Sequence, residues 1–231
     1  MGTVCLLRIE GAMTKVSRRR TTDAGYSLIE MMFTLGIMAV LVGMAVVTIS
    51  FSRPAALGDG AMRVVMSQMN TARERAITER RNMRVTFTLG NKVEIIREEV
   101  PGPTLTTVSS ILMEGGLQFV LVTNLVDTPD QFCTTSLASP CFPTATGTPL
   151  EVKFKPDGTF VNQDGGYVNG TVFVAQPGQV YNAGTSSTPG TSSSGVFSAR
   201  AITVLGSTGR VRGYRFDGSL ISSGNKYWKP V

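Results

Sequence analysis

The stretch that decides the fold is RRRTTDAGYSLIEMMFTLGIMAVLVGMAVVTI, residues 18–49. Its last 19 residues, 31–49, contain no charged residue, no amide and no proline. As an α-helix this run would extend roughly 28 Å at about 1.5 Å per residue, which is close to the hydrocarbon thickness of a bilayer. A buried core helix of this length would normally show a polar stripe, and this one does not. The pattern predicts a helix that spans a membrane or forms the core of a filament.

Three interpretations compete for this segment. A removable secretory signal needs a shorter apolar run, of about 7 to 15 residues. A permanent anchor fits the length, and the basic cluster Arg18 to Arg20 then predicts that this end stays in the cytoplasm. Neither interpretation explains Glu30, which directly precedes the apolar run. An acid at the membrane is a candidate functional residue, and the simpler alternative is a hydrated carboxylate at the headgroup boundary.

The third interpretation comes from a resemblance. Residues 18–30, RRRTTDAGYSLIE, resemble the processing site of type IV prepilins and type II secretion pseudopilins, in which most members carry Phe where this chain has Tyr26. The resemblance implies that a prepilin peptidase cuts between Gly25 and Tyr26 and methylates the new amino terminus. Met13 would give a leader of more typical length than Met1. The expected organisation is a leader over 1–25, a transmembrane or filament-core helix over 26–53, and a periplasmic or extracellular head over 54–231.

Cleavage would give the helix a charged tip. The freed α-amine of Tyr26 has a reference pKa of about 7.7 to 8.0 and is mostly cationic at neutral pH. Glu30 follows one helical turn later. Because buried charges need partners, the amine of one subunit can meet the carboxylate of its neighbour. We therefore expect Glu30 to set subunit register during assembly.

A second helix is expected after the apolar run. Arg53-Pro54, Gly58 and Gly60 predict a kink or a loosening, because proline removes a backbone hydrogen bond and glycine is a poor helix former. Helical spacing of apolar residues then predicts a helix over 61–81, with an apolar stripe that only Arg73 interrupts. The run ARERAI, residues 72–77, followed by a strand-like segment, resembles the GspH/FimT branch of minor pilins and pseudopilins.

The rest of the chain has the pattern of antiparallel sheet. Gly90-Asn91 indicates a hairpin between two strands, and Pro156-Asp157-Gly158 indicates another turn. The segment 182–195 is rich in Gly, Ser and Thr, which predicts a flexible surface loop. One helix ahead of many strands predicts an α+β head, with the helix packed on antiparallel sheet. The expected strands are 83–89, 92–98, 111–122, 150–154, 159–161, 171–175, 196–205, 210–216 and 219–221.

Composition argues against catalysis. The 231 residues contain no histidine, which excludes Ser-His-Asp and Cys-His nucleophilic sites and imidazole-ligated metals. No phosphate-binding loop, dinucleotide fingerprint or zinc spacing is present. We therefore expect no enzyme activity, no cofactor and no metal. Cys133 and Cys141 would face the oxidising side of the membrane, so a disulfide between them is expected.

A basic strip ends the chain. Residues 200–231 carry six bases and one acid, whereas residues 26–231 as a whole have a net charge of only +3. The string Gly209-Arg210-Val211-Arg212 resembles the C-terminal signature of FimT-type minor pilins, which bind DNA. Arginine pairs with phosphate regardless of base sequence. The alternative is that these arginines form the water-exposed face of a strand or contact acidic neighbours. The DNA-binding candidates are Arg210, Arg212, Arg215, Lys226 and Lys229.

The sequence thus predicts a subunit of an assembly. The expected function is that of a minor pilin or pseudopilin of a type II secretion pseudopilus or a type IV pilus, located in the inner membrane and then in the filament. The expected partners are prepilin peptidase, other pilins and the inner membrane, and double-stranded DNA is the partner in the alternative function. A membrane-anchored periplasmic binding domain is the alternative from another class.

Overall fold

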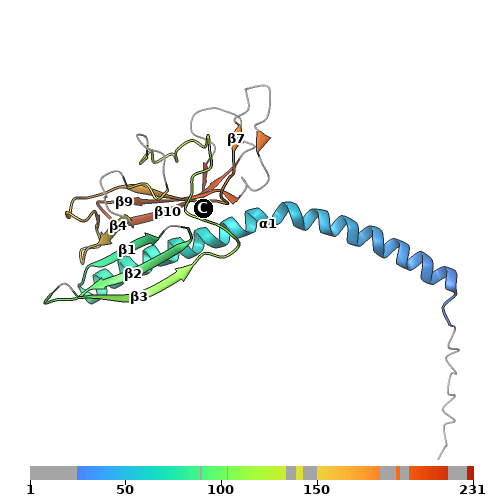
Figure 1. Cartoon of the computed structure of the whole chain (residues 1–231), viewed down its shortest axis with the longest axis horizontal. Coiled ribbons are helices and arrows are strands. Elements are labelled where there is room, and N and C mark those ends of the chain that lie inside the picture. Colours follow the sequence, from blue (N-terminus) through green and yellow to red (C-terminus); the bar gives the residue numbers. More distant parts are fainter. Residues whose placement is uncertain are drawn as a thin grey trace, which may run out of the picture. The chain divides into compact units, whose positions relative to one another are not determined.

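A long helix and a set of antiparallel strands make up the structure, a computed structural model (Figure 1). It describes residues 25–88, 90–102, 104–133, 139–142, 150–182, 191–192, 198–217 and 228–231. The chain divides into two compact units, Met1–Val46 and Val47–Val231. Helix α1, Leu28–Glu79, begins in the first unit and ends in the second.

The strands form two larger sheets and one small pair. The first sheet has the order β3-β2-β1-β4-β5 and the second the order β11-β10-β9-β6, while β7 pairs with β8. Every pairing is antiparallel, which confirms the α+β class that the sequence predicted. The strands are β1 Met83–Thr88, β2 Lys92–Glu98, β3 Leu105–Leu112, β4 Leu150–Phe154, β5 Phe160–Val161, β6 Gly170–Val174, β7 Tyr181–Asn182, β8 Thr191–Ser192, β9 Arg200–Leu205, β10 Arg210–Phe216 and β11 Trp228–Pro230.

The two helical segments marked by the sequence are joined in one helix. Helix α1 continues through Pro54, so the two expected helices are not separate, while the expected kink or loosening there stays a prediction. A tertiary contact next to Pro54 connects this part of α1 to β9. The Ala55 carbonyl accepts a hydrogen bond from Arg200 Nη2 at 2.9 Å. Gly58 packs against the residues that precede β9, where a Cβ on Gly58 would lie 2.4 Å from the Ser198 carbonyl oxygen. This glycine is therefore explained by the close packing of α1.

The C-terminal half of α1 packs through the predicted apolar stripe. Met62, Val65, Met69, Ala72 and Ala76 are all buried. They share one core cluster with apolar residues of β1, β2, β4, β6 and β9, so α1 contacts both larger sheets. A second cluster includes Phe173, Tyr214, Phe216 and Trp228, together with residues of the segment 120–125. The four-stranded sheet is therefore covered on both faces.

Some expected strands differ from the observed ones. The strand expected over 111–122 is wrong: β3 ends at Leu112, and of residues 113–122, all described, only Gln118 makes an isolated bridge, to Ala175. These residues instead cover the four-stranded sheet, where apolar side chains are buried without strand pairing. Part of the expected loop 182–195 forms β8. The short β11 was missed, and the expected strand over 219–221 lies outside the described residues.

The segment 117–133 is attached to the sheet by a disulfide. Cys133 and Cys141 are bonded, with their Cα atoms 6.1 Å apart, and both residues are buried. Cys141 also forms a bridge with Thr171 of β6. Asp127 accepts a hydrogen bond from the Cys133 amide at 2.8 Å. These contacts hold the nearby Asp130 against the four-stranded sheet.

Candidate functional site

The processing segment lies at the start of α1. Gly25, Tyr26 and Ser27 precede the helix, and the first backbone bond of the helix runs from the Met31 amide to the Ser27 carbonyl at 3.1 Å. Ser27 is therefore the N-cap residue, and Glu30 is the third residue of the first turn. The spacing Ser-x-x-Glu is that of a capping box, and a negative charge here is favoured by the helix dipole. The predicted scissile bond, Gly25–Tyr26, lies outside the helix.

The apolar segment that follows is exposed and is not buried by the residues that the structure describes. Leu28–Ile49 has a mean hydropathy of 2.4 and is long and apolar enough to cross a membrane. Its large side chains are exposed, and Phe33 has 72% of its surface accessible. Met32, Phe33, Ile37 and Val40 line a shallow apolar groove over Gly36. An apolar surface of this extent requires lipid or other helices around it.

Residues 20–46 match a family model described as the prokaryotic N-terminal methylation motif. The N-terminal segment of this chain is therefore similar to that of type IV prepilins. The match covers the candidate processing site and most of the apolar helix, and the motif implies processing by prepilin peptidase. No curated protein and no solved structure matches the chain. Pilin-like proteins are typically structural subunits without enzyme activity.

The second unit, Val47–Val231, places Arg210 and Arg212 on one face of β10. They pair with Leu205 and Thr203 of β9, two residues apart along the ladder. Side chains two residues apart in a strand share a face, as the sequence predicted. Both arginines are exposed and line one pocket beside Asp130.

Asp130 lies at the centre of the contacts on this face. Its carboxylate accepts hydrogen bonds from the Thr203 hydroxyl at 2.6 Å and the Tyr214 hydroxyl at 3.0 Å. Arg212 Nη1 lies 3.3 Å from the same carboxylate. Burial, together with the hydrogen bond to Asp130, raises the pKa of Tyr214 although Arg212 opposes the shift. Arg212 is therefore already paired, whereas Arg210 has no acidic partner among the residues that the structure describes.

The other members of the basic strip lie elsewhere. Arg215 belongs to the opposite face of β10, where its Nη1 is 4.0 Å from Asp59 of α1. Lys229 is the cross-strand neighbour of Arg215 and pairs with Asp217. Lys226 lies outside the described residues. The structure thus brings together Arg210 and Arg212 and separates Arg215 and Lys229 from them.

Sequence reasoning missed a buried ion pair between α1 and β9. Arg200 is fully buried, and its Nε donates to Asp59 at 2.7 Å. The same guanidinium donates to the carbonyls of Ala55 and Ala199. Burial lowers the pKa of Arg200, while the hydrogen bond from its guanidinium to Asp59 acts in the opposite direction. No spacing rule could have found this pair, because 141 residues separate its members.

Arg73 and Gly209, singled out as motif residues, have structural roles. Arg73 Nε lies 3.1 Å from the Thr208 carbonyl and 3.3 Å from the Gly158 carbonyl, so it connects α1 to two turns. Gly209 has a φ of +62°, and a Cβ there would be 2.1 Å from the Gly158 carbonyl oxygen. The glycine of the Gly-Arg-x-Arg string is therefore required by backbone packing.

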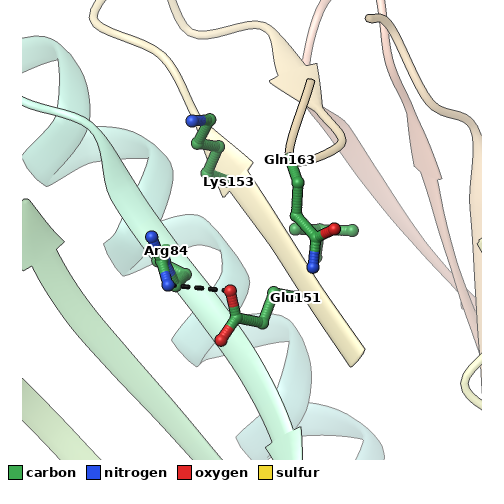
Figure 2. Close-up of a pocket in the computed structure, with 5 residues that line it drawn as sticks. Arg84, Glu151, Lys153 and Gln163 are labelled. Carbon is green, nitrogen blue, oxygen red and sulfur yellow. Dashed lines mark hydrogen bonds and ion pairs between the residues drawn. The ribbon is translucent and has the colours of Figure 1, made fainter. Parts of the chain in front are cut away.

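A second charged region covers the outer face of the five-stranded sheet. Arg84 of β1 pairs with Glu151 at 2.7 Å and with Glu98 at 2.9 Å. Figure 2 shows Arg84 and Glu151 joined across a small pocket, with Lys153 and Gln163 beside them. Burial would raise the pKa of Glu98, but hydrogen bonds from Arg84 and Asn82 outweigh it and lower that pKa. Because these charges neutralise one another, the pocket is better explained as a sheet-stabilising network than as a ligand site.

Proposed function

We propose that this protein is a minor pilin or pseudopilin of the GspH/FimT type. Prepilin peptidase would cut it between Gly25 and Tyr26, and its N-terminal helix would then assemble into a type II secretion pseudopilus or a type IV pilus. The observation that supports this most strongly is the methylation motif over 20–46, which continues into an exposed apolar helix. Before assembly the helix would anchor the protein in the inner membrane, with the head in the periplasm.

Processing is tested by mass spectrometry of protein recovered from membranes. We expect an amino terminus at Tyr26 carrying one added methyl group. A variant with Gly25→Leu should keep its leader and stay out of filaments, because the peptidase recognises the small residue at the cut. An uncut and unmodified terminus in the wild-type protein would reject the proposal and favour a membrane-anchored binding domain.

The assembly role of Glu30 is tested by Glu30→Gln. Glutamine suits the third position of a capping box as well as glutamate does, so helix capping is retained while the charge is lost. We expect normal cleavage and at least a tenfold loss of incorporation into filaments, measured by immunoblot of sheared filaments. Ser27→Ala, which weakens capping and keeps the charge, is the matched control and should assemble. Equal incorporation of wild type and Glu30→Gln would refute a register role.

DNA binding by the head is a second candidate, favoured by the shared face of Arg210 and Arg212. We expect the double variant Arg210→Ala with Arg212→Ala to abolish retardation of duplex DNA. Asp130→Asn should strengthen binding several-fold, because it frees Arg212 while the amide oxygen can still accept from Thr203 and Tyr214.

The control for this test removes the same charge from another part of the head. Arg63→Ala with Arg80→Ala alters two exposed arginines of the helix and its C-terminal turn and should leave retardation unchanged. Loss of two phosphate contacts should also reduce the slope of log affinity against log salt by about 1.8. Retardation that is insensitive to Arg210 and Arg212 would show that these residues do not contact DNA.

A further inference from the structure

A cleft of about 620 Å³ is lined by the residues that follow α1 and by the turn that joins β2 to β3. This volume is in the range of pockets that hold ligands, roughly 300 to 1,000 Å³. Arg80 and Arg81 line the cleft directly after the end of α1, and Pro156 lines it from the turn that follows β4. All of these residues belong to the second compact unit, so the cleft is formed within one part of the chain.

The first residue after α1 has an unusual backbone conformation. Arg80 has a φ of +51°, and the Arg81 amide donates a hydrogen bond to the Ala76 carbonyl at 3.2 Å. This bond is typical of a Schellman motif, in which the left-handed residue is usually glycine and sometimes asparagine. An arginine is less favourable at such a position, and backbone strain of this kind clusters at functional sites. The side chain of Arg80 is therefore a candidate ligand-binding group.

The charge of Arg80 is not neutralised by a neighbour. Its side chain is exposed, and among the residues that the structure describes it makes no hydrogen bond and no ion pair. Arg81 donates from Nη1 to the Val100 carbonyl at 3.1 Å, and this bond holds the guanidinium in place. Because a guanidinium has five N–H donors, Arg81 keeps further donors for a ligand. Two arginines that follow one another in the chain thus offer donors to the same cleft.

Two glutamates that line the cleft are already paired with other arginines. Glu98 lies 2.9 Å from Arg84, and Glu99 lies 2.7 Å from Arg97. The pKa of Glu99 is lowered chiefly by the hydrogen bond from Arg97, and Arg81 adds only a weaker attraction. These two carboxylates repel a ligand that carries several negative charges, since like charges in contact are unfavourable. The cleft therefore favours a single carboxylate over the repeated phosphates of duplex DNA.

Apolar surface adjoins the two arginines. Val100 is 68% exposed and Leu105 is 48% exposed, and both line the same cleft as Pro156. A free small acid would be poorly enclosed here, because small-molecule sites bury about 70 to 90% of their ligand. A peptide needs less enclosure, since it can contact the cleft with one face and keep the other face in water.

We propose that this cleft binds a peptide segment of another protein in which one carboxylate lies beside an apolar side chain. The carboxylate pairs with Arg80 and Arg81, and the apolar side chain packs on Val100 and Leu105. Arginine binds a carboxylate through two parallel hydrogen bonds, which fix the orientation of the peptide and add affinity. This role explains an arginine at a backbone position that suits glycine. The site goes beyond the assembly function proposed above, and it depends neither on cleavage of the leader nor on DNA binding.

The experiment is equilibrium dialysis of the full chain in detergent against a model peptide. The probe is acetyl-Gly-Ser-Glu-Leu-Ser-Gly-amide, whose blocked ends leave the glutamate as its one charge, and micelles without protein correct for partition into detergent. We expect saturable binding with a Kd of about 1 mM or below, and about tenfold weaker binding when glutamine replaces the glutamate. Absence of saturable binding, or equal binding of the two peptides, would overturn the proposal. Binding of 3-methylbutanoate as tight as that of the peptide would overturn the peptide as the ligand.

Arg80→Asn separates binding from stability. Asparagine adopts the left-handed conformation more readily than arginine, so we expect a higher urea midpoint together with about tenfold weaker peptide binding. Leu105→Thr keeps a strand-forming residue but removes apolar surface, and it should weaken binding severalfold. Arg63→Gln, the matched control, removes the same charge from an exposed position of α1 and should leave binding unchanged. A lower urea midpoint for Arg80→Asn, or peptide binding equal to wild type, would show that Arg80 does not serve this site.

Discussion

Asp59→Ala is expected to destabilise the head by about 3 kcal/mol. It removes the counter-ion of Arg200, whose side chain has 0% of its surface exposed, and Arg215 lies near the same carboxylate. Breaking one partner of a buried pair typically costs about 3 to 5 kcal/mol, because the remaining charge has no compensation. The lower end applies because the Asp59 side chain is 33% exposed and water can replace part of it. Urea unfolding followed by fluorescence of Trp228, the single tryptophan, measures the change.

Two variants separate this effect from a general loss of charge. Asp59→Ala combined with Arg200→Met removes both charges and should recover most of the lost stability, since an apolar replacement of a buried pair is often neutral or better. Glu79→Ala breaks the partly exposed contacts to Arg75 and Arg97 and should cost less than about 1 kcal/mol. If Asp59→Ala and Glu79→Ala had the same small effect, the Asp59–Arg200 pair would not be holding α1 to β9.

Gly209→Ala is expected to cost about 3 kcal/mol or more. The residue has a φ of +62°, which costs an L-residue roughly 1 to 2 kcal/mol. The new Cβ would also lie 2.1 Å from the Gly158 carbonyl oxygen and 3.0 Å from Arg73 Nε. Relieving this overlap needs backbone movement in two turns, a further cost of about 1 to 3 kcal/mol. The same urea titration provides the measurement.

Gly178→Ala is the matched control for Gly209→Ala. Gly178 has a similar φ of +76°, but no atom lies within 4 Å of the position its Cβ would take. It should therefore show the conformational cost alone, about 1 to 2 kcal/mol. Equal losses for the two variants would mean that the close approach of the two turns does not contribute.

Local patterns predicted much of the fold. The apolar run, the helical stripe from Met62 to Ala76 and the hairpin at Gly90-Asn91 each depend on neighbours in sequence, so periodicity and turn residues reveal them. The bounds of β2, β4 and β10 agree with the expected ones. The prediction over 111–122 was wrong because apolar residues such as Leu117 and Phe119 are buried outside any strand. The two expected helices are one continuous helix through Pro54, and the contact from Arg200 of β9 to the Ala55 carbonyl could not be anticipated from the sequence.

For the candidate sites too, the sequence predicted local features and not contacts between distant residues. The predicted processing segment is short and continuous, so the sequence alone was enough to name Gly25, Tyr26 and Glu30 as candidates. The alternation of β10 also placed Arg210 and Arg212 together. The acid beside Arg212 could not be anticipated, because Asp130 comes from a segment 82 residues away.

The sequence by itself determined that this chain carries a prepilin-like N-terminal methylation motif and an apolar helix, because both are properties of consecutive residues. Tertiary structure alone decided which charges are available. It buried Arg200 against Asp59, paired Arg212 with Asp130 and left Arg210 without an acidic partner among the described residues. It also decided that β3 lies at an open edge. Charge pairing and sheet order depend on residues that are distant in the chain and become neighbours only when the helix and sheets pack together.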